Sequence, residues 1–233
     1  MPLFSEVGML FLLRWIHFLA GVLWIGLLYY FNFVQGPFFA EADAATKSTA
    51  TQKLVPRALW WFRWGAMLTF LSGVAILGMR QASWNDPWGM TILTGAAFGT
   101  LMFLNVWLVI WPNQKIVIAS AVAAASGGQA DPKAAAAGRR AFLASRTNVV
   151  LSFPMLFFMG AASHLTLDPS HNAGLFGVLL LVVLALLEIN ALAGTTGPTK
   201  KPIETVRGVI VTGFVTTAIV YALAQAVLSS AGM

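Results

Sequence analysis

The chain alternates between long apolar runs and shorter polar, charged segments. Each apolar run approaches the ~20 residues that an α-helix needs to cross the hydrocarbon core of a bilayer. The six runs occupy residues 8–34, 59–78, 90–111, 148–165, 173–193 and 206–228. Because lipid offers no hydrogen-bond partner to free backbone groups, each run is expected to be helical. The pattern therefore predicts an all-α bundle of about six transmembrane helices, forming one integral membrane domain over residues 1–233.

Proline and glycine mark the predicted ends of these spans. Pro37 is expected to end the first span and Pro112 to close the third. Residues 113–147 then form a long connection on the cytoplasmic side. Two alanine-rich stretches in it, 119–125 and 134–137, are expected to be surface helices on either side of a glycine hinge.

Composition narrows the class of protein. Hydrophobic residues make up 58% of the chain and charged residues only 9%, whereas soluble domains carry about 25% charged residues. The absence of cysteine excludes disulfides, iron–sulfur clusters, thiolate metal sites and covalent c-type haem attachment. The net charge of +6 comes from a few segments between spans, so it indicates membrane topology and not nucleic-acid binding.

The basic residues predict how the bundle is oriented. Twelve of the 14 lysines and arginines fall in or beside three segments, residues 35–63, 112–147 and 194–207. Only Arg14 and Arg80 fall toward the other side. By the positive-inside rule these three segments face the cytoplasm. Both termini are therefore expected on the outer, periplasmic side of a bacterial inner membrane.

One polar stripe in the first span is the strongest candidate for a site. Arg14, His17, Gly21 and Trp24 recur about once per turn, so they share a helical face. Ionisable groups inside a bilayer usually face a cofactor, a partner or a cavity. His164 is expected at the outer end of the fourth span, at the same side of the membrane as His17.

Two imidazoles from facing helices are the ligands that a b-type haem takes in a helix bundle. His17 and His164 are thus candidate ligands of the haem iron, and Arg14 would pair with the haem propionates. Gly21 would make room for the macrocycle and Trp24 would supply an apolar wall. The alternative is structural, with His17 in an interhelical hydrogen bond and His164 among lipid headgroups.

A second polar set lies in the other half of the bundle. Glu188 is the one acid deep within a predicted span. It is a candidate for proton transfer or contact with a quinone headgroup, or for a salt bridge to Arg63 or Arg207. Asn105 and Asn148 are expected either to join helices, as small polar residues do in bilayers, or to line a site.

Three stretches of the sequence resemble the membrane domain of bacterial membrane-bound urate hydroxylases, the urate oxidase N-terminal family. The first contains Trp15, His17, Gly21 and Trp24-Ile25-Gly26. The second runs from Asn105-Val-Trp107 to Ile110-Trp-Pro-Asn-Gln-Lys115. The third runs from Arg146-Thr-Asn148 through Ser152 and Pro154-Met155 to His164.

The resemblance implies an integral membrane redox protein, with His17 and His164 as favoured haem or active-site residues. Longer members carry a cytochrome c domain at the C-terminal end, which this sequence, without cysteine, is expected to lack. The expected function is electron transfer between quinol or a small substrate and an external cytochrome c, including urate hydroxylase-like oxidation. The alternatives are a cofactor-free accessory subunit of a larger respiratory complex and a small-solute transporter.

Overall fold

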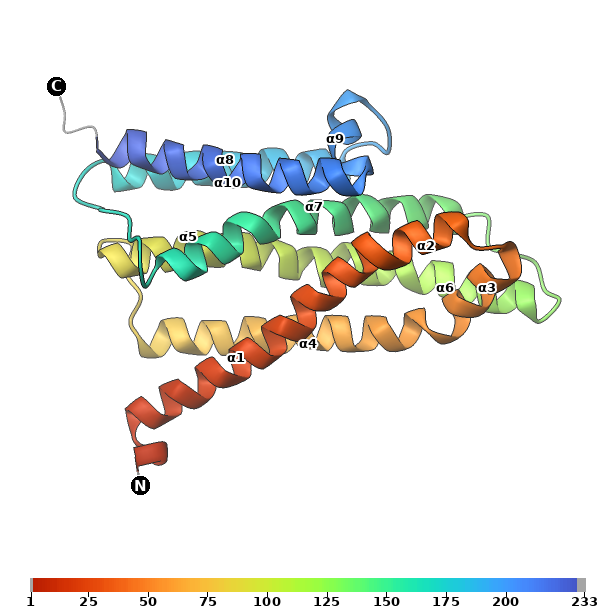
Figure 1. The fold of residues 1–233 in the computed structure, drawn as a ribbon, viewed down its shortest axis with the longest axis horizontal. Coiled ribbons are helices and arrows are strands. Elements are labelled where there is room, and N and C mark those ends of the chain that lie inside the picture. Colours follow the sequence, from red (N-terminus) through yellow and green to blue (C-terminus); the bar gives the residue numbers. More distant parts are fainter. Residues whose placement is uncertain (1, 230–233) are drawn as a thin grey trace.

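The computed structural model describes residues 2–229, and all regular structure in this range is helical (Figure 1). Six helices are long and apolar enough to cross a membrane, which confirms the predicted number of spans and fits a multi-pass membrane protein. They are α1 (Glu6–Tyr29) with η2 (Tyr30–Gln35) and α2 (Gly36–Glu41), α4 (Val55–Met79), α5 (Pro87–Leu104) with η3 (Asn105–Ile110) and α6 (Trp111–Ala125), α7 (Ala134–Ala161), α8 (Ala173–Leu192) and α10 (Val206–Leu228). The short elements are η1 (Pro2–Phe4), α3 (Ala44–Lys53), η4 (Pro198–Lys200) and α9 (Lys201–Glu204).

The prediction that Pro37 and Pro112 end their spans is wrong. In both places the helix continues through the proline, to Glu41 and to Ala125. Each proline is preceded by a π-helical segment, η2 or η3, in which the backbone hydrogen bond spans five residues instead of four. A proline ring inside an α-helix clashes with the carbonyl four residues earlier. The wider π turn shifts that carbonyl aside, so the helix continues.

The predicted connection over residues 113–147 is consequently much shorter. Helices α6 and α7 cover most of it, and only residues 126–133 lie between them. The two alanine-rich stretches are helical, as expected, and they continue the neighbouring spans as the end of α6 and the start of α7. A glycine pair does lie at the turn, as expected, and Gly127 adopts a positive φ of 79°.

Helix α7 is the centre of the bundle. It is the most buried of the six spanning helices, and it packs against α5, α6 and α10 (Figure 1). Helix α1 packs mainly along α4, at one edge of the molecule. The two backbones approach closely at Gly65, where a Cβ atom would lie 3.2 Å from the backbone nitrogen of Trp24. Glycine therefore permits this close α1–α4 packing.

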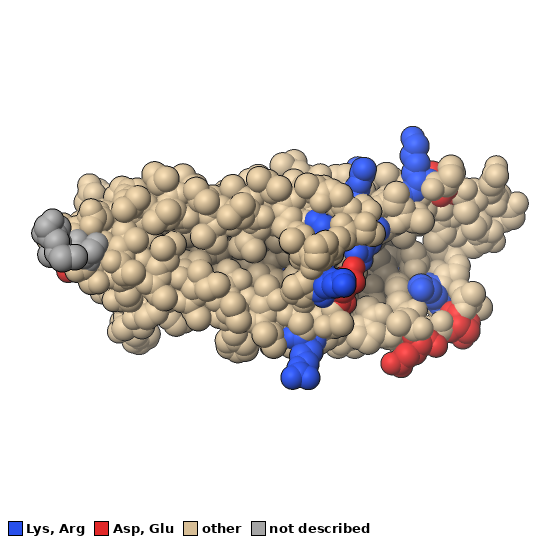
Figure 2. Space-filling view, turned by 90° about the horizontal axis from the view of Figure 1, so that it is seen from above, with Lys and Arg blue, Asp and Glu red and all other residues tan. Residues whose placement is uncertain are grey.

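The two ends of the bundle differ in charge. Helix α1 begins and α10 ends at one end, which we call the terminal end (Figure 1). Helices α2, α3 and α9 lie at the other, which we call the basic end. Figure 2 shows the visible lysine and arginine side chains gathered in the half of the molecule that includes the basic end. This asymmetry agrees with the charge pattern from which the orientation in the membrane is predicted.

Candidate functional site

His17 lies in the contact between α1 and α4, where it meets Ser72. Its Nδ1 atom is 3.1 Å from the Ser72 hydroxyl oxygen. The same hydroxyl lies 2.6 Å from the carbonyl oxygen of Leu68 and donates its proton there. The serine oxygen is therefore left to accept a hydrogen bond from Nδ1–H. In a neutral imidazole with its proton on Nδ1, the lone pair available for ligation is on Nε2.

Gly73 determines how closely His17 approaches α4. A Cβ atom at this position would lie 3.1 Å from His17 Cε1 and 3.5 Å from Nδ1. The imidazole can thus lie directly against the α4 backbone. Ser72 and Gly73 were not candidates from sequence. Their one signal is a pair of small residues within an otherwise bulky apolar span.

The other members of the predicted stripe divide between the interface and the outside. Gly21 faces α4, where a Cβ atom would be 3.9 Å from Thr69 Cγ2. Trp24 is 2% exposed, and its indole Nε1 is buried without a hydrogen-bond partner. Arg14 is exposed. Gly21 and Trp24 therefore extend the α1–α4 contact made by His17, whereas Arg14 lies outside it.

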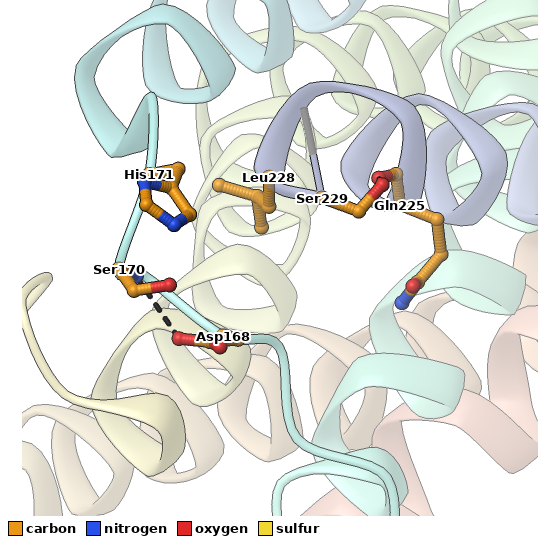
Figure 3. A pocket seen from close by; sticks show the side chains of 6 residues that line it. All are labelled: Asp168, Ser170, His171, Gln225, Leu228 and Ser229. Atoms are coloured by element: carbon orange, nitrogen blue, oxygen red, sulfur yellow. Dashed lines mark hydrogen bonds between the residues drawn. The ribbon is translucent and has the colours of Figure 1, made fainter. Parts of the chain in front are cut away.

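The other two histidines lie at the terminal end. His164 is exposed in the turn after α7. His171 lines an open pocket of about 260 Å³ between the α7–α8 connection and the end of α10 (Figure 3). The other lining residues are Asp168, Ser170, Gln225, Leu228 and Ser229. Asp168 accepts a hydrogen bond of 3.0 Å from the backbone N–H of Ser170, which lowers the pKa of its carboxyl group.

No hydrogen bond joins His17 to His164 among the described residues, and the two lie in different elements, α1 and the turn after α7. His17 contacts α4, and the start of α1 lies apart from the end of α7 in Figure 1. Within residues 2–229 there is no group of three or more histidine, aspartate or glutamate side chains placed to hold a metal ion. Pairing of these two imidazoles on one iron stays a prediction from sequence.

The second polar set does come together, near the middle of the bundle. Asn105 donates from Nδ2 to Asn148 Oδ1 and to Glu188 Oε2, each at 3.0 Å. Asn148 in turn donates to the carbonyl oxygen of Met102 at 2.9 Å. Three helical segments, η3, α7 and α8, are thereby joined through side chains. Among the described residues Glu188 makes no salt bridge, so the predicted alternatives with Arg63 and Arg207 are wrong.

Polar side chains also link the first span to α7. The Tyr29 hydroxyl lies 2.9 Å from the Ser152 hydroxyl. Asn32, in η2, donates from Nδ2 to Ser145 Oγ at 2.8 Å. Tyr29 was not a candidate from sequence, because a tyrosine near the end of a span is usually an interface anchor.

Comparison with known proteins identifies a family for most of this structure. A family model described as urate oxidase N-terminal matches residues 83–223, which is more than half of the chain. No curated protein and no solved structure matches. The matched range includes Asn105, Asn148, His164 and Glu188, and it begins after α1 and α4.

Proposed function

We propose a redox function for this chain, which belongs to the urate oxidase N-terminal family. In this proposal it is a multi-pass protein of the bacterial inner membrane that binds a b-type haem through His17. It transfers electrons between quinol or a small substrate and an external cytochrome. Family membership and the six apolar helices support a membrane protein, and the surroundings of His17 support the haem.

The hydrogen bond between His17 and Ser72 carries the proposal. Histidines that ligate metals almost always donate their other ring N–H to an acceptor, which fixes the tautomer and the orientation of the ring. His17 has this arrangement, with Nδ1 at 3.1 Å from an oxygen whose own proton is donated to Leu68. The residues present thus fit a haem whose iron would be held by His17 Nε2. When bound, the haem iron supplies one-electron transfer.

Trp24 gives independent support for a bound group near this interface. Its indole N–H is buried without an acceptor, and a buried donor left unpaired costs about 1–3 kcal/mol. Trp24 lies on the same face of α1 as His17 and Gly21, so an oxygen of a ligand held there would satisfy it. His17 alone carries the ligation in this proposal, because His164 is exposed in a separate turn.

The position of His17 along α1 fits electron exchange with an external cytochrome. It lies in the half of α1 nearer the terminal end, which the charge pattern assigns to the outer side. A haem at His17 would thus be within the half of the membrane that an external cytochrome approaches. The imidazole is half-buried, and its Nδ1 side faces Ser72 of α4.

Haem content of single-residue variants tests the proposal. We expect His17→Ala to lose its haem during purification and His171→Ala to keep it, since His171 is exposed in the connection between α7 and α8. His17→Met retains a ligand for iron, so it should keep haem with a higher reduction potential. A His17→Ala protein with its full haem content would refute ligation by His17.

A further inference from the structure

Glu188 lies within an apolar helix and has no cation as a partner. It is half-buried, and it is the only charged residue of α8. The one salt bridge in the described part of the chain joins Arg139 to Glu204. The Lys200 ammonium, which follows the end of α8, donates instead to the Ala193 carbonyl oxygen at 3.1 Å. Because an unpaired carboxylate is costly in hydrocarbon, the Glu188 carboxyl is expected to hold a proton.

The hydrogen bonds around Glu188 indicate which carboxyl oxygen would carry that proton. Asn105 donates from Nδ2 to Glu188 Oε2 at 3.0 Å, so Oε2 is an acceptor. The second N–H of the same Nδ2 goes to Asn148 Oδ1, and Asn148 in turn donates to the Met102 carbonyl oxygen. Each amide in this chain therefore has a defined donor direction. A carboxyl that accepts at Oε2 has its other oxygen, Oε1, available for the proton.

Glu188 Oε1 lies at the surface of the chain. Within residues 2–229 it makes no hydrogen bond, yet it is not one of the buried side-chain atoms left without a partner. It is therefore on the exposed side of this half-buried residue. Helix α8 ends four residues later, at Leu192, which is a rise of about 6 Å. A proton on Oε1 is thus about one helical turn from the basic end of the bundle.

An open cavity of about 170 Å³ lies beside the same turns of α7 and α8. Its lining includes Thr147 and Leu187, the residues directly before Asn148 and Glu188. The cavity has room for several water molecules, which occupy about 30 Å³ each in the liquid. Polar side chains of its lining could bind such waters, and they belong to Thr147, Asn190, Thr199 and Thr212. Because Thr199 lies in η4, at the basic end, the cavity provides space for water between that end and the turn that carries Glu188.

We propose that Glu188 is a proton-binding site that exchanges its proton with the basic end of the bundle. The ligand is a proton on Oε1, and its release leaves a carboxylate that Asn105 still holds through Oε2. A hard metal cation such as Na⁺ does not fit, because such ions take oxygen ligands, whereas Asn105 turns an N–H toward the carboxyl group. The site does not require haem at His17, so the two proposals stand or fall separately.

Dicyclohexylcarbodiimide, an apolar reagent, tests for a protonated carboxyl group within the membrane. The carboxyl oxygen bonds to the central carbon of the reagent while the proton moves to a reagent nitrogen. The acyl group then migrates to nitrogen and nothing leaves, so the chain gains the whole mass of the reagent. We treat the full chain in nanodiscs and expect one addition at Glu188, located by peptide mass spectrometry. Glu188→Gln, which keeps an acceptor for Asn105, should lose it. Glu204→Gln, which removes an exposed acid, should keep it.

Infrared spectra of the same samples test whether the proton exchanges. The C=O stretching band of a protonated carboxyl should be present in the wild-type chain, shift in D₂O, and be absent from Glu188→Gln. The proposal is overturned if Glu188 is not labelled in the wild-type chain, if NaCl protects it where choline chloride does not, or if the band does not shift in D₂O. If Glu188→Gln fails to fold, the labelled position in the wild-type chain decides. A colourless chain would leave these results unchanged, since none of the readouts uses haem.

Discussion

His17 and Ser72 face each other across the α1–α4 contact, with the imidazole Nδ1 3.1 Å from the serine oxygen. The two residues are 55 positions apart in the sequence. The Ser72 hydroxyl donates its proton to the Leu68 carbonyl oxygen. The hydrogen bond between His17 and Ser72 therefore fixes the imidazole tautomer with its proton on Nδ1. In the proposed function, this hydrogen bond leaves His17 Nε2 free to bind the haem iron.

Ser72→Ala should weaken haem binding without removing the ligand. Loss of an outer partner of a metal-ligating histidine costs about 10- to 100-fold in metal affinity. Haem release to an excess of apomyoglobin measures this affinity. Thr217→Val is the control, because Thr217 makes a similar bond within its helix, to the Gly213 carbonyl oxygen at 2.9 Å. Equal release rates for the two variants would show that Ser72 does not orient a ligand.

Gly73→Ala should disturb the position of His17, whereas Gly78→Ala, in the same helix α4, should not. Alanine is more favourable than glycine within a helix by about 1 kcal/mol. At Gly78 no atom lies within 4 Å of the added Cβ, so Gly78→Ala should be neutral or stabilising. At Gly73 the added Cβ would be 3.1 Å from His17 Cε1, and the ring must move. Gly73→Ala should therefore shift the haem absorption bands, and unchanged bands would contradict the placement of His17.

Much of the fold was predictable from sequence, because a long apolar run directly predicts a membrane-spanning helix. The predicted span at residues 206–228 agrees with α10, and Thr205 caps this helix at its start by accepting from the Gly208 N–H. The continuation of helices past Pro37 and Pro112 was not predictable. It depends on π turns, and the shift of a hydrogen bond from four residues to five leaves no mark in hydrophobic periodicity.

The candidate sites were predictable only in part. Glu188, Asn105 and Asn148 were identified because polar residues within apolar runs are conspicuous, but their mutual hydrogen bonds depend on how the helices pack. Ser72 is as small and common as many residues that line no site. Arg146 was counted as a basic residue of a connection, and only the extended helix α7 shows that it is buried.

Asn105→Leu should destabilise the bundle. The substitution removes the donor to Asn148 and Glu188, and leaves one buried acceptor, Asn148 Oδ1, and one half-buried acceptor, Glu188 Oε2, short of a partner. The expected loss in the free energy of unfolding is about 1–3 kcal/mol. Unfolding in mixed micelles of increasing SDS content measures it. Asn113→Leu serves as the control, since Asn113 bonds only to the Val109 carbonyl oxygen of its own helix. Equal stability of both variants would argue against the joined polar network.

Gly213→Ala tests the packing of α10 on α7. An added Cβ would lie 2.5 Å from Phe153 Cδ2, so the aromatic ring or the helix must shift. Overpacking of this kind costs about 1–3 kcal/mol, and the unfolding temperature should fall. Gly174→Ala, where nothing lies within 4 Å, should leave it unchanged or raise it. An unchanged unfolding temperature in Gly213→Ala would mean that α10 and α7 lie further apart than in this structure.

The most direct test of the central claim is a pyridine haemochrome assay of the purified wild-type chain, together with its reduced-minus-oxidised absorption spectrum. The redox proposal predicts a b-type spectrum and about one haem per chain, held through His17. A colourless protein without haem, purified from haem-replete cells, would contradict it. His17 would then be a helix-packing residue bonded to Ser72, and the chain would be a cofactor-free accessory subunit of a larger membrane complex.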